Sequence, residues 1–334
     1  MNEKSLDILD QYDLNIYRSV RGRGGMIVIT NQGDKLLLEC VKQDKYYKRE
    51  DVITRAVKQG GYEYLDTYVK NKDGEIISEA SDEGRKYVLK DMYPGSECNV
   101  RSIRDILDAV SAMARLHIAL DNAADAIISE DNEFVLTRGN VAKTIIRHTK
   151  EMRMAGNYLR NKKQKTEYEM SIYRNIGRFY AEAQRACGML GDKAVVDGIA
   201  KADSVNSLIH GNYTYHNIII SDTGVAVTNM EKCRIDSQVL DLYQFMRKIL
   251  EKYNWDIDLA YKMLDEYDKV KRISDEDIGI MSVLFAFPEK FWKIVNHYYN
   301  MNKAWVSPKS IEKLNGCVEQ NIRRLDFVAT ICAL

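Results

Sequence analysis

Several residue types and patterns that mark extracellular, fibrous or membrane proteins are scarce in this sequence. Only 3 prolines occur in 334 residues, which excludes collagen-like repeats and proline-rich stalks. The 6 cysteines form no C-x-x-C pair, and this spacing favours reduced thiols over a disulfide framework or a zinc site. The longest apolar run, residues 278–287, is far shorter than the ~20 residues of a membrane-spanning helix. We therefore expect no membrane span, and the acidic residues 1–13 lack the pattern of a signal peptide.

An excess of charge of one sign is also absent. The 49 Lys and Arg residues balance 49 Asp and Glu residues, so no global field attracts nucleic acid or an anionic membrane. The apolar fraction of 45% is that of a soluble globular protein with a substantial core. Residues 140–165 are a local exception, because they hold eight basic side chains. Such a run is either a solvated helix face or a docking surface for an acidic partner.

The first third of the chain has the pattern of a small antiparallel sheet. Short apolar or alternating runs are separated by Gly- and Asn-containing turns. Residues 46–60 have helical spacing. The predicted strands cover residues 15–20, 26–30, 35–41, 68–70, 75–77 and 86–90.

The only Pro-Gly dipeptide, Pro94-Gly95, favours a turn and predicts a boundary between two lobes. Helical periodicity follows from about residue 102, with a break near residues 162–165, and strand-like runs return only between 207 and 228. The prediction is an α+β protein with a β-rich lobe over 1–93, a hinge over 94–99 and a helical lobe over 100–334. A short β hairpin at 207–228 interrupts the helical lobe.

The segment His210-Gly211-Asn212-Tyr213-Thr214-Tyr215-His216-Asn217 lies between two apolar strands, and a third strand ends before Asn229. This layout directs residues 212–217 and Asn229 toward one point. It resembles the H-G-D-x-x-x-x-N and I-D-x-[ED] elements of the aminoglycoside-phosphotransferase and choline-kinase group. Within that group, this segment and residues 93–100 and 241–248 look most like the CotS family of bacterial spore-coat proteins.

The resemblance implies a two-lobed protein-kinase-like fold, with ATP and Mg²⁺ as cofactors in active members. It also implies synthesis in the mother-cell cytoplasm, a place in the spore coat, and coat proteins as partners, with a nucleotide or small molecule as a further ligand. No nucleic-acid partner is expected. Phosphoryl transfer in such a fold needs a catalytic carboxylate, carboxylate and amide ligands for Mg²⁺, and a lysine on the phosphates.

The sequence departs from that pattern at three positions. Asn212 stands at the catalytic aspartate, and an amide cannot take up a proton near neutral pH. Asn229 stands at the metal-holding aspartate, which weakens Mg²⁺ binding although Asn217 keeps the amide ligand. Glu39 aligns with the strand lysine, while a register slip would bring Lys42 there instead.

Other residues are candidates for supporting roles. The resemblance gives His210 a loop-bracing role, and Gly22, Gly24 and Gly25 form either a hairpin turn or a phosphate-covering loop. Glu50 is either the partner of the strand lysine or a solvated helix charge, and we expect the second. Two acids that follow the degenerate metal position could rescue metal binding, namely Glu231 and Asp236.

Three functions remain open at this point. The departures favour a catalytically degenerate kinase-like coat protein with a structural or interaction role. An active ATP-dependent small-molecule phosphotransferase with a displaced metal site is the first alternative. A nucleotide-binding regulatory module without turnover is the second.

Overall fold

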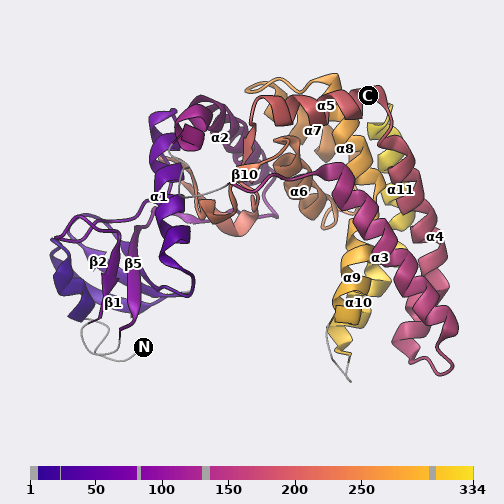
Figure 1. The fold of residues 1–334 in the computed structure, drawn as a ribbon, viewed down its shortest axis with the longest axis horizontal. Coiled ribbons are helices and arrows are strands. Elements are labelled where there is room, and N and C mark those ends of the chain that lie inside the picture. Colours follow the sequence, from indigo (N-terminus) through magenta and orange to yellow (C-terminus); the bar gives the residue numbers. More distant parts are fainter. Residues whose placement is uncertain (1–6, 23, 81–83, 130–135, 301–305, 334) are drawn as a thin grey trace. The chain divides into compact units, whose positions relative to one another are not determined.

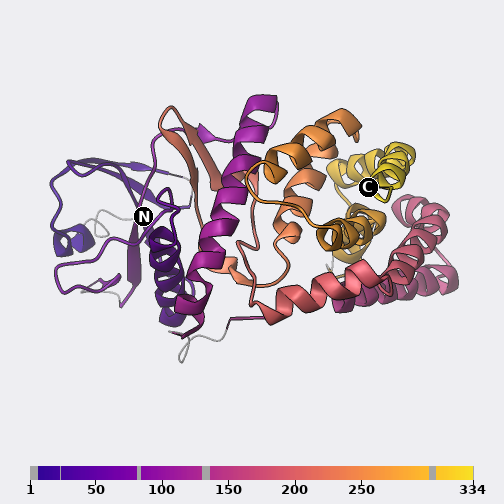
Figure 2. The same ribbon diagram turned by 90° about the horizontal axis from the view of Figure 1, so that it is seen from above.

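The computed structural model describes residues 7–22, 24–80, 84–129, 136–300 and 306–333. The chain divides into two compact units, which are described separately below (Figures 1 and 2). The first unit comprises residues 1–137 and 208–235, and the second comprises residues 138–207 and 236–334. No described helix is long and apolar enough to cross a membrane.

A five-stranded antiparallel sheet opens the first unit. Its strand order is β1-β2-β3-β5-β4, and hairpins join the first three strands, as the turn residues predict. A short 3-10 helix, η2 (Asp7–Gln11), contributes apolar residues that pack with Val28 and Leu37 in the core beside this sheet. The strands are β1 (Ile16–Arg21), β2 (Met26–Thr30), β3 (Lys35–Glu39), β4 (Ile77–Glu79) and β5 (Lys86–Asp91).

Two helices and a second set of strands complete the first unit. Helix α1 (Asp44–Gln59) packs against α2 (Ile103–Ser129), and α2 also contacts β7 and β9. The polar loops that follow β7 and β9 are thereby held beside α2, a helix with many buried residues. The short elements are β6 (Ser96–Glu97), β7 (Leu208–Ile209), η3 (Tyr215–Asn217), β8 (Ile218–Ser221), β9 (Gly224–Val227), η4 (Met230–Lys232) and β10 (Arg234–Ile235).

The second unit consists of helices around the apolar helix α8. Every residue of α8 from Ile280 to Ala286 is buried, as is typical of a helix that is apolar on all faces, and α8 contacts α4, α5, α6 and α11. The break near 162–165 separates α3 from α4, and Thr166 begins α4 with a capping box. The helices are α3 (Val141–Asn161), α4 (Glu167–Met189), α5 (Lys193–Ser204), α6 (Val239–Leu250), α7 (Ile257–Asp268), α8 (Asp275–Ala286), α9 (Glu289–Asn300), α10 (Pro308–Glu319) and α11 (Asn321–Ile331).

The predicted fold class is confirmed, since a small antiparallel sheet precedes a larger helical part. The strand predicted at 68–70 is wrong in extent, because Tyr68 makes one isolated bridge to Lys90. The same edge of β5 pairs with β4 at residues 86–88, which leaves little room for a further strand. The lobe boundary at 94–99 stays a prediction, and the first compact unit extends beyond it to include α2.

The predicted hinge contains a strand, because Ser96 and Glu97 pair with Ile220 and Ile219 of β8. Gly95 makes this approach feasible. Its φ is +130°, and a Cβ atom there would lie 2.3 Å from the carbonyl oxygen of Ile220. Only glycine fits both the backbone conformation and the space.

We predict that Gly95→Ala destabilises the protein by at least ~2 kcal/mol, because it adds a steric clash to backbone strain. Gly74→Ala is the matched control, since Gly74 has φ +83° but open space at its Cβ position. The control should lose only about 1 kcal/mol. Urea unfolding of both variants measures the difference, and equal losses would contradict a close approach of residue 95 to β8.

Candidate functional site

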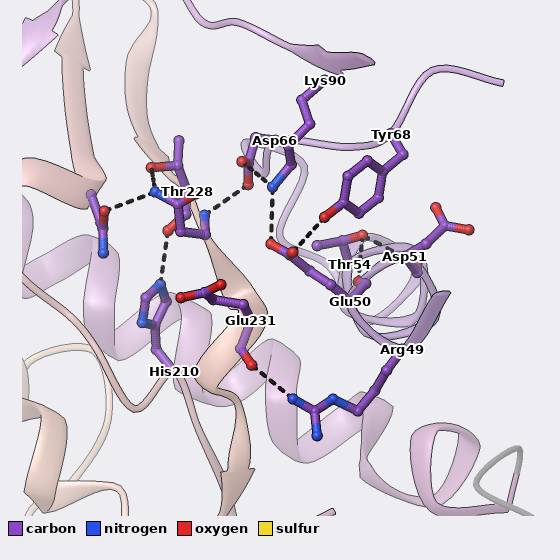
Figure 3. A network of polar contacts seen from close by, with 12 residues as sticks. Arg49, Glu50, Asp51, Thr54, Asp66, Tyr68, Lys90, His210, Thr228 and Glu231 are labelled. Carbon is purple, nitrogen blue, oxygen red and sulfur yellow. Dashed lines mark hydrogen bonds and ion pairs between the residues drawn. The ribbon is translucent and has the colours of Figure 1, made fainter. Parts of the chain in front are cut away.

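The loop after β7 is held by His210, whose side chain is fully buried. The backbone N–H of Asn212 donates to Nδ1 of His210 at 3.1 Å. Nε2 lies 3.0 Å from the carbonyl oxygen of Thr228, so it carries the proton and donates (Figure 3). A neutral imidazole therefore joins the loop to the end of β9, and these are the contacts of a loop-bracing histidine.

The remaining loop contacts fix the backbone at residues 211–213. Gly211 has φ +76°, and a Cβ atom there would lie 2.3 Å from the carbonyl oxygen of Lys232. The hydroxyl of Tyr213, which is fully buried, donates to the carbonyl oxygen of Ala109 in α2 at 2.7 Å. The loop is therefore anchored on both sides of Asn212.

Three asparagines named from the sequence are brought together at this loop. Nδ2 of Asn229 donates to Oδ1 of Asn217 at 2.9 Å. Nδ2 of Asn217 donates in turn to the carbonyl oxygen of Asn212 at 3.0 Å. The three residues are thus linked by two hydrogen bonds between uncharged groups. In each bond, a side-chain amide N–H donates to an amide oxygen.

Asn229 has a left-handed backbone with φ 65°, a conformation that asparagine tolerates better than most residues. Its backbone N–H donates to Oδ1 of Asp66 at 3.0 Å. This bond links the asparagine chain to a buried ionic cluster formed by residues of α1, of β5 and of the segment between α1 and β4.

The cluster consists of one lysine between two carboxylates (Figure 3). Nζ of Lys90 lies 2.9 Å from Oε1 of Glu50 and 2.6 Å from Oδ2 of Asp66. The Tyr68 hydroxyl donates to Oε2 of Glu50 at 2.6 Å, and Lys90 lies over the Tyr68 ring. The Lys90 side chain is only 3% exposed, so the charges compensate one another away from water.

The expectation that Glu50 is solvated is wrong, because Glu50 is 4% exposed and ion-paired. Lys90 and Asp66 were not among the site residues expected from the sequence. Glu50 shares a helical stripe with Ile53 and Val57, which are buried core residues. A glutamate on an apolar stripe needs a buried cation, and this signal could have revealed the cluster.

Two carboxylates share one ammonium group, so the cluster carries excess negative charge when all three groups are ionised. Burial opposes ionisation of Lys90, but Asp66 and Glu50 raise its pKa. Burial also opposes ionisation of Glu50, yet Lys90 and the Tyr68 hydroxyl hold its pKa below the ordinary value. Burial raises the pKa of the Asp66 carboxyl group to about 6, although the nearby Lys90 ammonium group favours the ionised form. Asp66 is therefore the group that takes up a proton first.

The two first-lobe positions named from the sequence lie apart from this cluster. Glu39 ends β3 and is exposed, with Tyr87 as its cross-strand partner. Lys42 forms an exposed ion pair with the carboxylate of Glu231, while Arg49 donates to the Glu231 carbonyl oxygen at 2.8 Å. The lysine that pairs with the α1 glutamate comes from β5 rather than from β3.

The acids that could rescue a metal site have other contacts. Glu231 is held by Lys42, as described above. Asp236 belongs to the second compact unit, is buried, and accepts a hydrogen bond from the Ser237 N–H at 3.0 Å. Among the described residues, no group of three or more His, Cys, Asp and Glu side chains could hold a metal ion.

The glycine-rich segment forms the turn of the β1–β2 hairpin. The N–H of Gly22 donates to the carbonyl oxygen of Gly25 at 2.9 Å, and Arg21 pairs with Met26 in register. Gly24 lies in this turn, whereas Arg23 lies outside the described residues. A phosphate-covering role for Gly22, Gly24 and Gly25 stays a prediction.

The raised pKa of Asp66 gives a test of the cluster. Its value of about 6 exceeds the ordinary 3.8, so between these pH values the folded state binds a proton that the unfolded state has lost. This stabilisation is present below pH ~4 and is lost as pH rises through ~6. Urea unfolding of wild type and Asp66→Asn should show that the stability of the wild type relative to the variant falls as pH rises from ~4 to ~6. A difference that does not change with pH would contradict the account.

The chain resembles solved phosphotransferase structures over nearly its whole length. An aminoglycoside phosphotransferase from Alicyclobacillus acidocaldarius has a TM-score of 0.84 at 16% identity, covering 98% of this chain and 95% of its own. A spectinomycin phosphotransferase solved with ADP and spectinomycin has a TM-score of 0.66 at 9% identity, covering 100% and 99%. An amicoumacin kinase solved with AMP-PNP and Ca²⁺ has a TM-score of 0.55 at 9% identity, covering 99% and 94%. These likenesses show the fold.

Sequence comparison gives the family. No curated protein matches the chain, but residues 5–331 match the family model described as "Spore coat putative kinase YutH". The predicted resemblance to CotS-type spore-coat proteins of kinase-like fold is confirmed. The chain therefore belongs to this spore-coat family of kinase-like proteins.

Proposed function

We propose that this protein is a kinase-like spore-coat protein without phosphotransferase activity, which acts as a structural or protein-interaction module in coat assembly. The family match over residues 5–331 supports the place in the coat. One observation carries the loss of activity: Nδ2 of Asn229 donates to Oδ1 of Asn217 where a kinase would hold its metal.

The hydrogen bond replaces what a cation does in an active site of this fold. A carboxylate at residue 229 would direct an oxygen at the oxygen of Asn217, and two facing oxygens need a cation between them. An amide at residue 229 supplies an N–H instead, and the pair is satisfied without metal. The donor set present therefore does not fit Mg²⁺, and Asn212 cannot act as a general base.

Two lysines near Asn229 and Glu231 already have carboxylate partners. Lys90 is enclosed by Glu50 and Asp66, so its charge is already compensated inside the protein. Moving this ammonium group to a phosphate would leave two buried carboxylates without a partner, which costs several kcal/mol. The exposed Lys42 is paired with Glu231.

A nucleotide-binding module without turnover is the second candidate. The spectinomycin phosphotransferase with which the chain shares its fold was solved with ADP. A nucleotide can bind such a fold through its base and sugar without a metal, so binding and catalysis need separate tests. The active phosphotransferase alternative has no comparable support, because the acid nearest to Asn229 in sequence, Glu231, is ion-paired.

We predict that several millimolar ATP produces no Mg²⁺-dependent rise in the Tm of the wild-type protein. The double variant Asn212→Asp/Asn229→Asp should gain a Mg²⁺-dependent rise, because it restores two carboxylates beside Asn217. A Kd ten times below the ATP concentration adds about 1.4 kcal/mol of stability, which thermal shift detects.

A matched control is Asn254→Asp, because Asn254 also has a left-handed backbone, with φ 53°, but lies in the second unit. It should show no metal-dependent rise. A Mg²⁺-dependent rise with wild-type protein would sink the proposal that activity is lost. A metal-independent rise with wild-type protein would instead favour the nucleotide-binding module.

A further inference from the structure

A pocket within the second unit is lined by residues of α3 and α9, two helices that contact each other (Figure 1). Its volume is about 270 Å³, which is below the usual range of small-molecule sites and close to the size of one large side chain. Most of its wall is aliphatic or aromatic, with contributions from Met152, Met154, Ala155, Tyr158, Trp292, Val295 and Tyr299.

The aromatic wall is fixed before any partner binds. The indole of Trp292 stacks on the imidazole of His148, with ring centroids 3.4 Å apart. Its Nε1 donates to Oε2 of Glu151 at 2.8 Å. Tyr158 packs edge-to-face against Tyr299 at 5.4 Å. Because these side chains are already fixed, binding costs little side-chain entropy. The pocket is therefore suited to accept the side chain of one anchoring residue of a partner protein.

The rim of the pocket exposes apolar side chains to solvent. Met154 is 60% exposed and Tyr158 is 53% exposed, although both are large and apolar. They lie four residues apart, so they share one face of α3. Exposed apolar groups beside a pocket are typical of a protein contact surface.

The same face of α3 is basic in the turns before the pocket. Lys143, Arg147 and Lys150 precede Met154 and Tyr158 at helical spacing, so all five form one stripe. The three basic side chains are exposed, and none forms an ion pair with a carboxylate among the described residues. Residues 141–165 hold eight basic residues and one acidic residue in a chain whose net charge is zero. The surface therefore combines a local positive field with an apolar socket.

We propose that this surface, the α3–α9 socket, binds an acidic protein segment that inserts one aromatic or large aliphatic side chain between Met154 and Trp292. Acidic residues of the segment then face Lys143, Arg147 and Lys150. The proposal deepens the interaction role proposed above by assigning the partner class, and it does not involve the asparagine loop or nucleotide. A bare polyanion matches the charge but leaves the apolar pocket unfilled, which favours a peptide over nucleic acid.

Selection of a random 12-residue peptide library on the full-length protein tests the proposal. Enriched peptides should contain an aromatic or large aliphatic residue flanked by Asp or Glu. Their binding should weaken with increasing salt, because the charged contacts lie at the surface. Absence of enriched peptides, or enrichment of neutral or basic ones, would overturn the proposal.

Two variants locate the binding surface. Lys143→Glu/Lys150→Glu reverses two exposed charges and should weaken an enriched peptide about tenfold or more. Ala155→Leu fills the pocket and should do the same, with circular dichroism confirming that it folds. Lys262→Glu is the control, because Lys262 is exposed on α7, a helix that does not line the pocket, and it should change affinity less than about threefold.

Equal affinity for wild type and the Lys143→Glu/Lys150→Glu variant would overturn the assigned surface. A fluorescent 12-nucleotide single-stranded DNA is the competing probe. If it binds and displaces the peptide while Ala155→Leu has no effect, the surface is an anion site and the peptide proposal fails. None of these outcomes depends on nucleotide or Mg²⁺, so this proposal and the loss of activity can fail separately.

Discussion

One continuous path of polar contacts joins the sheet of the first unit to the loop after β7. It runs from Glu50 through Lys90 and Asp66 to the backbone of Asn229, and from there through Asn217 to Asn212. Each residue on the path provides the ion-pair or hydrogen-bond partner of the next residue. Glu50, Lys90, Asp66 and Asn217 are buried, so removal of one of these side chains leaves a buried neighbour unsatisfied, and such losses are large. The geometry of the loop therefore depends on charges placed in a different element of the chain.

The path explains how a kinase-like loop can keep its shape without a metal. In an active site of this fold, a cation draws the oxygens of the loop together. Here the side-chain amides of Asn217 and Asn229 bond to each other, and His210 holds the backbone on either side. Under the proposed loss of activity, Asn212 and Asn229 take the place of the catalytic and metal-holding carboxylates while the loop keeps its shape. This combination is what an interaction module on an enzyme fold requires.

The sequence was sufficient for parts of the structure that depend on local pattern. The β1–β2 and β2–β3 hairpins, the break between α3 and α4, and the gathering of Asn212, Asn217 and Asn229 all follow from turn residues and strand spacing. Lys90 and Asp66 were missed because the ion pairs Glu50–Lys90 and Asp66–Lys90 join residues that are 40 and 24 positions apart. Local rules treat a lone helix glutamate as solvated, and only the apolar stripe around Glu50 contradicts that rule. The strand predicted at 68–70 is reduced to a single bridge at Tyr68, since competition with β4 for one edge of β5 is a tertiary effect that the sequence pattern does not reveal.

The central claim is that the asparagine loop is complete without a cation. Titration of Mn²⁺ into the wild-type protein, followed by the electron paramagnetic resonance signal of free Mn²⁺, measures this directly. The account predicts that the protein removes no stoichiometric Mn²⁺ from solution, and that ATP plus protein removes no more than ATP alone. Stoichiometric loss of the free signal with wild-type protein, abolished by Asn217→Leu, would contradict it.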